Sequence, residues 1–167
     1  DRLVSRGLGD VYKRQRVTNN FIVGLRFSQW KQHDFDAKLA QTPDELEKVI
    51  MPPVNAGLDY LHSSMRRFWE SEFPDSKENL AYWTKKISDI TTIGVGSVGL
   101  DSDFIDMMAP ANPTSIDKAI EDISSNKYEL IAVGRALISD PNWVIKMKEG
   151  RFDELIPYTK ESLLTLY

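Results

Sequence analysis

The stretch TTIGVGSVGL at residues 91–100 is a continuous apolar run that ends in a cluster of glycines. A second run, ELIAVGRAL at residues 129–137, also ends in Val-Gly, and an arginine follows its glycine. Apolar residues that are continuous rather than alternating are typical of strands covered on both faces in a parallel sheet. Both runs therefore predict buried parallel strands, each followed by a glycine-containing loop.

Two similar runs occur earlier in the chain at a regular interval. FIVGLRFS begins at Phe21, and GLDYLHSS begins at Gly57. The cores of the four runs lie about 35 residues apart, which is ample for a strand, a loop and a helix in each unit. Alternating strands and helices predict an α/β protein with a parallel sheet. Spacing alone leaves open whether the four βα units form an open sheet or half of an eight-stranded (β/α)8 barrel.

Helix-start signals lie between these runs. Thr42-Pro43-Asp44-Glu45 combines a capping threonine, a proline in the first turn and a glutamate three residues after the cap. We expect this helix to kink or end at Pro52-Pro53, because proline lacks the N–H donor that a helix interior needs. Further helices are predicted to open at Ser76, Ser115 and Asp140. Their apolar stripes, which we expect to pack in the core, are Leu80, Trp83 and Ile87; Ile116, Ile120 and Ile123; and Trp143, Val144 and Met147.

Composition restricts the class of protein. The chain has 167 residues and a net charge of −4, so it lacks the basic surface expected for a nucleic-acid partner. No stretch approaches the roughly 20 apolar residues that span a bilayer, so we expect no membrane partner. Cysteine is absent, which excludes disulfides within these residues and suits a cytoplasmic location. His33 and His62 are the only histidines and lie far apart in sequence, so no metal site is predicted.

The first residues form a separate segment. DRLVSRGLGDVYKRQ, residues 1–15, is rich in basic side chains and lacks the apolar core of a secretory signal. One interpretation is a basic arm or a targeting leader. GDVYKRQ, however, is similar to the translated read-through of a sequencing adapter. We therefore interpret residues 1–15 as a non-native leader, and we expect the true protein to begin near Arg16 with its upstream half missing.

The two glycine loops are candidates for binding an anion. Glycine at the carboxyl end of a parallel strand lets main-chain N–H groups approach a ligand closely. In (β/α)8 barrels a frequent phosphate site lies in the loops after strands seven and eight, beside a short helix. Gly96 and Ser97 would supply main-chain donors, and Gly134 with Arg135 would add a guanidinium in a bidentate contact. The alternative interpretation is that these glycines merely end strands.

Arg26 is a further candidate cation. It lies late in the run at residues 21–28, where an inward-facing charge is costly unless it is paired. One interpretation is a salt bridge at the rim with a carboxylate such as Asp59. The other is a charge that faces the electron-rich part of a cofactor whose phosphate is bound by the glycine loops. Arg26 and the two loops together predict a mononucleotide with a reducible ring.

Four parts of the sequence resemble the old yellow enzyme family of NADH:flavin oxidoreductases. They are GLRFSQW; TPDELEKV with AGLDYLHSSMRRFWE; NLAYWTKK with ITTIGVGSVGL; and ELIAVGRALISDPNWV, whose VGRALISDPNWV is the most specific. Their order and spacing are similar to strands five to eight of that family's flavin barrel. The resemblance implies that residues 16–167 are the C-terminal half of a TIM-type (β/α)8 barrel.

The same resemblance implies a cofactor and a reaction. FMN would be held without a covalent bond, reduced by NADH or NADPH, and would pass hydride to an activated alkene or a similar small-molecule substrate. By motif, Arg26 is similar to the arginine at the flavin pyrimidine, where negative charge develops on reduction. Gly96 and Ser97 resemble the main-chain phosphate donors after strand seven. Gly134 and Arg135 resemble the Gly-Arg pair that binds the same phosphate.

No catalytic residue is predicted within this chain. In this family the pair that polarises the substrate carbonyl and the tyrosine that donates a proton belong to the first half of the barrel. Tyr60 and His62 do not match those motifs, and we interpret His62 as a polar residue with a hydrogen-bond partner near the strand end. Arg66, Arg67 and Trp69 have two interpretations. They form an entrance for substrate or nicotinamide, or they are a loop anchor with a buried tryptophan and solvent-facing arginines.

Two other functions remain open from the sequence. A barrel with the same phosphate site but no flavin would be a lyase or isomerase that acts on a phosphorylated metabolite. A non-catalytic half-barrel would instead pair with another chain through its open strand edges. We expect this chain to be inactive by itself, and its residues leave open whether the protein is a homo-oligomer.

Overall fold

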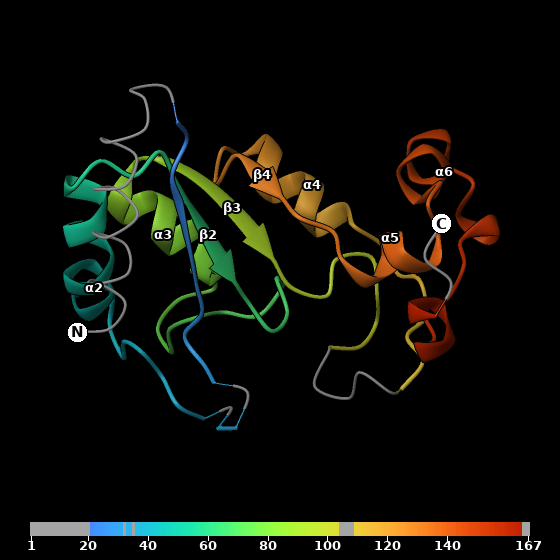
Figure 1. The fold of residues 1–167 in the computed structure, drawn as a ribbon, viewed down its shortest axis with the longest axis horizontal. Coiled ribbons are helices and arrows are strands. Elements are labelled where there is room, and N and C mark those ends of the chain that lie inside the picture. Colours follow the sequence, from blue (N-terminus) through green and yellow to red (C-terminus); the bar gives the residue numbers. More distant parts are fainter. Residues whose placement is uncertain (1–20, 32, 35, 104–108, 165–167) are drawn as a thin grey trace.

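The computed structural model describes residues 21–31, 33–34, 36–103 and 109–164. Its sheet has four parallel strands that follow one another in chain order (Figure 1). The strands are β1 (Gly24–Phe27), β2 (Tyr60–Ser64), β3 (Thr91–Val95) and β4 (Leu130–Ile131). The predicted α/β fold with a parallel sheet of four βα units is confirmed. The leader predicted at residues 1–15 lies outside the described residues.

Helices connect the strands and continue beyond the last of them. They are α2 (Pro43–Asn55), α3 (Leu80–Ser88), α4 (Asp117–Ser124), α5 (Arg135–Ser139) and α6 (Trp143–Glu149). Two 3-10 helices follow, η1 (Phe152–Glu154) and η2 (Lys160–Leu163). Of the helices that the structure describes, none is both long enough and apolar enough to cross a bilayer.

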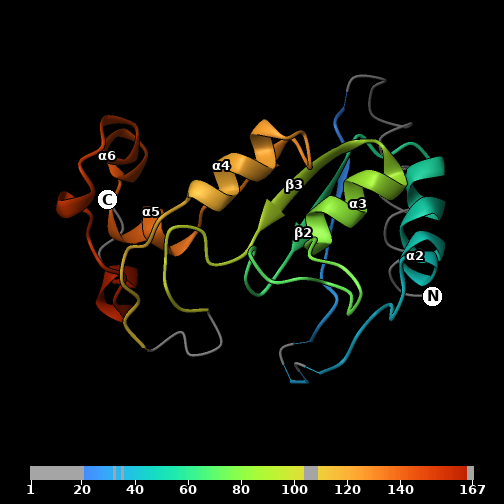
Figure 2. The ribbon, with the colours of Figure 1, turned by 180° about the vertical axis from the view of Figure 1, so that it is seen from behind.

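The helices cover one face of the sheet. Figures 1 and 2 show α3 and α4 on the same side of the strands, with α3 against β2 and β3 and α4 beside β4. On this side the Ser63 hydroxyl of β2 donates to the Thr84 hydroxyl of α3 at 2.9 Å. The other side carries Arg26, His62 and Ile93, which share one register and are at least partly exposed. Within the described residues the helices pack on one face only, so the predicted covering of the other face stays a prediction.

The first helix begins as the sequence predicts but extends further. Thr42 caps α2 by accepting from the Glu45 N–H at 3.2 Å, and the Glu45 carboxylate accepts from the Gln41 N–H at 2.7 Å. The helix then passes through Pro52 and Pro53 and ends at Asn55, so the doublet does not end it. Each proline removes one helix N–H, and both lie among the last four residues of α2, so few helical hydrogen bonds are lost.

The later helices begin two to four residues after the positions that the sequence indicates. Asn79, rather than Ser76, caps α3, and its side-chain oxygen accepts from the Tyr82 N–H at 2.9 Å. Ser115 accepts from the Asp117 N–H at 3.0 Å just before α4. The segment predicted to open at Asp140 is preceded by the separate helix α5 and becomes helical only at Trp143.

Most of the predicted apolar stripe residues reach the core, but two do not. Leu80 and Trp143 are buried, and others of the stripes pack partly against the core. Ile120 is 54% exposed and Val144 is 55% exposed. The expectations for Ile120 and Val144 were wrong, because only a narrow face of α4 and of α6 packs against the core.

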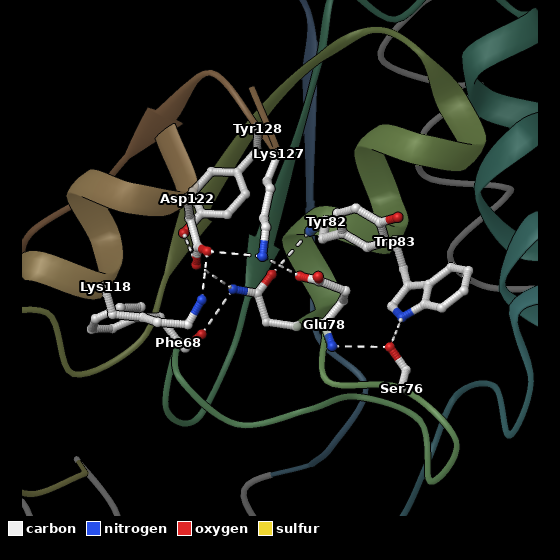
Figure 3. Close-up of polar contacts among 10 residues, drawn as sticks. Phe68, Ser76, Glu78, Tyr82, Trp83, Lys118, Asp122, Lys127 and Tyr128 are labelled. Atoms are coloured by element: carbon white, nitrogen blue, oxygen red, sulfur yellow. Dashed lines mark hydrogen bonds and ion pairs between the residues drawn. The ribbon is translucent and has the colours of Figure 1, made fainter. Parts of the chain in front are cut away.

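A buried carboxylate links three elements behind the sheet. Asp122 of α4 is 1% exposed, and its Oδ1 lies 2.7 Å from Lys118 Nζ and 3.3 Å from Lys127 Nζ (Figure 3). The Tyr128 hydroxyl donates to the other oxygen at 3.4 Å, and burial raises the pKa of Tyr128, so this hydroxyl keeps its proton. The Asn79 amide also donates to that oxygen at 3.5 Å. The network therefore joins the start of α3, the helix α4 and the segment that enters β4.

The turn after β3 depends on a glycine. Gly99 has a φ of 74°, and a Cβ added there would lie 2.6 Å from Cζ2 of the buried Trp143. We expect Gly99→Ala to lower the free energy of unfolding by about 2 kcal/mol, because it combines an unfavourable backbone conformation with overpacking. Gly150→Ala is the matched control, since Gly150 has a φ of 73° but nothing within 4 Å of an added Cβ. Urea unfolding of both variants checks this, and equal losses would show that Trp143 has no part in the effect.

Candidate functional site

The carboxyl ends of the parallel strands surround a cavity of about 390 Å³. The loops after β1, β2, β3 and β4 all contribute to its walls. Its lining includes every residue for which the sequence predicts a cofactor contact, namely Arg26, Gly96, Ser97, Gly134 and Arg135. Ser28, Trp30, Ser64, Met65, Val95, Val98 and Leu100 complete the lining. The structure thus brings together residues that span more than 100 positions of sequence.

The loop after β3 presents main-chain donors at this edge. Among the described residues, the N–H groups of Ser97 and Val98 have no acceptor. Ser97 has a φ of 52°, a left-handed conformation that is unfavourable for a side-chain-bearing residue. Its hydroxyl donates to the Arg66 carbonyl at 3.1 Å, so the side chain fastens the loop to the one after β2. The main chain of this loop, rather than the serine hydroxyl, is what an anion could contact.

The two glycines at the cavity have different reasons to be glycine. A Cβ at Gly96 would lie 2.8 Å from the Met65 carbonyl oxygen, so the glycine allows β3 to end tightly against the loop after β2. Gly134 precedes α5, and an added Cβ there would meet nothing within 4 Å. Packing within the described residues therefore accounts for Gly96 but not for Gly134.

Arg135 lies at the first position of α5 and is partly buried. Its Nη2 donates to the Ser102 carbonyl at 2.6 Å, and its Nη1 donates to the Asp103 carbonyl at 3.1 Å. Its guanidinium carbon lies 5.4 Å from the centroid of the Tyr158 ring. Burial lowers the pKa of Arg135, while Tyr158 and Asp103 oppose this, and a guanidinium stays charged at any ordinary pH. Of its five N–H donors, these contacts use two.

Arg26 projects from the exposed face of β1. Its Nη2 donates to the Ser64 hydroxyl at 3.2 Å. The register places Arg26 beside His62. Asp59 lies three residues before His62, just ahead of β2, and its carboxylate accepts from the Val23 N–H at 2.7 Å. The salt bridge between Arg26 and Asp59 that the sequence allows is therefore absent from the described residues.

Tyr60 and His62 of β2 are the two side chains to which the sequence analysis assigns no catalytic role. Burial, and then the charge of Arg26, lower the pKa of His62, so its neutral form is favoured. His62 Nε2 is buried and has no hydrogen-bond partner within the described ranges. The interpretation of His62 as a residue with a partner was therefore wrong for this part of the chain. Tyr60 packs its ring directly over Gly24 of β1.

The loop after β2 lines a second, smaller cavity of about 160 Å³ beside the first. Both Arg66 Nε and Arg67 Nη2 contact the same Asp103 carboxylate oxygen, at 2.7 Å and 2.9 Å. Trp69 is 38% exposed, whereas its neighbour Phe68 is buried. The loop-anchor interpretation was thus wrong about the tryptophan. The side chains of Arg66 and Arg67 are 39% and 31% exposed, so they face solvent in part, and through Asp103 they hold the loop after β3.

Comparisons with known proteins place this chain in a structural class. No protein-family model matches it. Morphinone reductase, as the N189A mutant in complex with tetrahydroNAD, superimposes with a TM-score of 0.56 over 84% of this chain at 16% identity. TcOYE crystallised with pHBA superimposes with a TM-score of 0.50 over 77% of this chain at 18% identity. These likenesses establish the fold, which is that of part of an old yellow enzyme barrel.

A curated relative agrees in sequence. NADH:fumarate oxidoreductase of Klebsiella pneumoniae (strain 342) is 26% identical over 149 residues, which are 85% of this chain. The predicted relation to the old yellow enzyme family is confirmed, and the chain corresponds to only part of the proteins it matches. It spans 14% of the NADH:fumarate oxidoreductase, 32% of morphinone reductase and 29% of TcOYE.

Sequence reasoning missed the residues that hold Arg135. Ser102 and Asp103 act through main-chain carbonyls, which carry no sequence signal. Tyr158 lies between η1 and η2, 23 positions after the arginine, and no motif connects the two. These three residues determine where the guanidinium lies.

Proposed function

We propose that the protein containing this chain is an FMN-dependent NAD(P)H oxidoreductase of the old yellow enzyme type, which transfers hydride from reduced flavin to an activated alkene or a similar acceptor. The observation that carries the proposal is the single cavity at the carboxyl edge of the sheet, lined by all five residues predicted to contact the cofactor. The name of the curated relative is consistent with it, because fumarate is an activated alkene and NADH is the donor named there.

The residues at the cavity fit the phosphate of a mononucleotide. The N–H groups of Ser97 and Val98 have no acceptor within the described residues, so they can donate to phosphate oxygens. The open space beside Gly134 admits a ligand close to the main chain. Arg135 supplies a positive charge and retains unused donors for a bidentate contact.

Arg26 fits the opposite end of the same cofactor. It is exposed at the cavity, and Ser64 orients its guanidinium. When bound, FMN supplies the hydride-transfer chemistry. The chain's part would be to hold the phosphate through the loops after β3 and β4 and to place a cation where negative charge develops on the reduced ring. We assign no catalytic residue to this chain.

The test is the colour and reactivity of the native full-length protein. We expect it to purify with, or to take up, FMN in a one-to-one complex whose visible absorbance bleaches when NADH or NADPH is added without oxygen. An activated alkene such as fumarate should then restore the colour. A protein that neither carries nor takes up FMN would contradict the proposal. Tight binding of a phosphorylated metabolite by that colourless protein would favour a lyase or isomerase.

The isolated chain is the control for this experiment. We expect these 167 residues alone to show no NAD(P)H-dependent reduction of an activated alkene, because β1 and β4 have only one neighbouring strand each in the described structure. Robust activity of the isolated chain would contradict our assignment of the catalytic residues to other parts of the protein.

A further inference from the structure

We infer that Tyr158 is a positioning residue for Arg135, and that the segment after α6 is therefore part of the phosphate site. The inference rests on the proposed function, because it gives Arg135 a phosphate to bind. It goes beyond that function by assigning a role to a residue 23 positions away in sequence that does not line the cavity.

The contacts of Arg135 come from two sides. On one side, the carbonyl groups of Ser102 and Asp103 accept from its two terminal nitrogens. On the other, the Tyr158 ring lies 5.4 Å from the guanidinium carbon, within the range of a cation–π interaction. Arginine has many rotamers of similar energy, so a guanidinium restrained from both sides loses less freedom when it binds an anion.

Tyr158 is itself firmly placed. It is 0% exposed, and its main chain pairs in both directions with Ala111, at 2.8 Å and 2.9 Å. The next residue, Asn112, is bound to Asp101 through three hydrogen bonds, at 3.0, 2.8 and 2.9 Å. The surface behind the guanidinium is thus tied to the loop in front of it, so the two sides form one frame.

The Tyr158 hydroxyl makes no hydrogen bond within this frame. It is buried and has no hydrogen-bond partner within the ranges that the structure describes. The ring faces the guanidinium, and phenylalanine has a ring of the same size. The pair Tyr158→Phe and Tyr158→Leu therefore separates the aromatic ring from mere bulk.

The experiment compares FMN with riboflavin, which lacks the phosphate, in the native full-length protein stripped of flavin. For Tyr158→Leu we expect FMN affinity to fall roughly 3- to 30-fold, the range of a cation–π interaction, with riboflavin affinity unchanged. For Tyr158→Phe we expect both affinities to match the wild type. In an Arg135→Ala background, Tyr158→Leu should have no further effect, because its action runs through the guanidinium.

Other outcomes overturn the inference. Equal loss of FMN and riboflavin affinity in Tyr158→Leu would show a general effect on the fold. Unchanged FMN affinity, or a Tyr158→Phe variant as weak as the leucine variant, would also refute a role of the ring. If the leucine variant does not fold, Tyr158→Met makes the same comparison. Failure of the proposed function looks different, since the wild type would then bind no FMN, or Arg135→Ala would bind it equally well.

Discussion

Replacing Asp122 with alanine is expected to lower the free energy of unfolding by about 3 kcal/mol, because breaking a buried ion pair leaves its partners without compensation. Asp122 is the member of the network that is shielded from water, whereas Lys118 and Lys127 keep side-chain exposures of 42% and 21%. The lysines can therefore reach solvent after the substitution, and the loss should lie at the lower end of the range for buried pairs. Urea or thermal unfolding measures it.

The network gives Asp122 more than one role. Its carboxylate accepts from Tyr128, whose protonated hydroxyl is otherwise buried. It also contacts Asn79, which caps α3 and donates to the Phe68 carbonyl at 2.8 Å (Figure 3). Loss of the carboxylate should thus loosen the start of α3 and the loop after β2 as well as α4.

Two variants control for this result. Asp122→Asn keeps the size and one acceptor oxygen but loses the charge and the second acceptor, so it should lose less stability than alanine. Glu149→Ala removes a carboxylate from an exposed pair with Arg151, at 2.8 Å, and should leave stability nearly unchanged. If Asp122→Ala were as stable as Glu149→Ala, the buried network would not contribute to the fold.

The strands of this sheet could be predicted because their signal is local. A continuous apolar run identifies β3, two similar runs at a regular interval identify β1 and β2, and helix-start signals identify the helices between them. The last strand is shorter than its run. β4 contains only Leu130 and Ile131, although the Ala132 N–H still donates to the Gly94 carbonyl at 2.8 Å. An edge strand with a neighbour on one side lacks the second ladder of hydrogen bonds that would extend it, and an apolar run cannot show how many neighbours a strand has.

Helix starts and faces were predicted less well, for a different reason. Ser76 and Asn79 are both good capping residues, and only the fold decides between them. Ser76 instead accepts from the Glu78 N–H at 2.9 Å and from the Trp83 indole at 3.3 Å. Ile120 and Val144 follow the helical spacing of core residues, but each lies at the edge of the core-facing side of its short helix. Short helices have few turns, so a small rotation moves such residues into solvent.

The candidate site shows the same division. A glycine follows each of two apolar runs, and an arginine follows the second glycine. These residues identify the two loops, because residue type and position along the chain are visible in the sequence. The partners of Arg135 are not, since Ser102 and Asp103 lie 33 and 32 residues away and contact it through the main chain. Contacts of this kind follow from tertiary packing, and a local pattern contains no information on them.

Replacing Arg135 with alanine is expected to weaken FMN binding by the native full-length protein about 10- to 150-fold. This corresponds to a charge-assisted hydrogen bond of roughly 1.5–3 kcal/mol. The residue lines the cavity and is held there by the carbonyl groups of Ser102 and Asp103. Among the described residues, Arg135 is the arginine that the loop after β4 contributes to the cavity lining, and the substitution removes it. Titration of flavin-free protein with FMN, followed by flavin fluorescence, measures the change.

Three comparisons make this prediction specific. Arg135→Lys keeps the charge but not the forked geometry, so its FMN affinity should lie between those of the wild type and the alanine variant. Arg151→Ala removes an exposed arginine that contacts Glu149 and Glu154 and does not line the cavity, so it should bind FMN normally. Riboflavin affinity should be equal in all of these proteins, because riboflavin has no phosphate. FMN binding that is unaffected by Arg135→Ala would mean that this guanidinium serves only to hold the loop after β3, and the phosphate would have to be bound elsewhere.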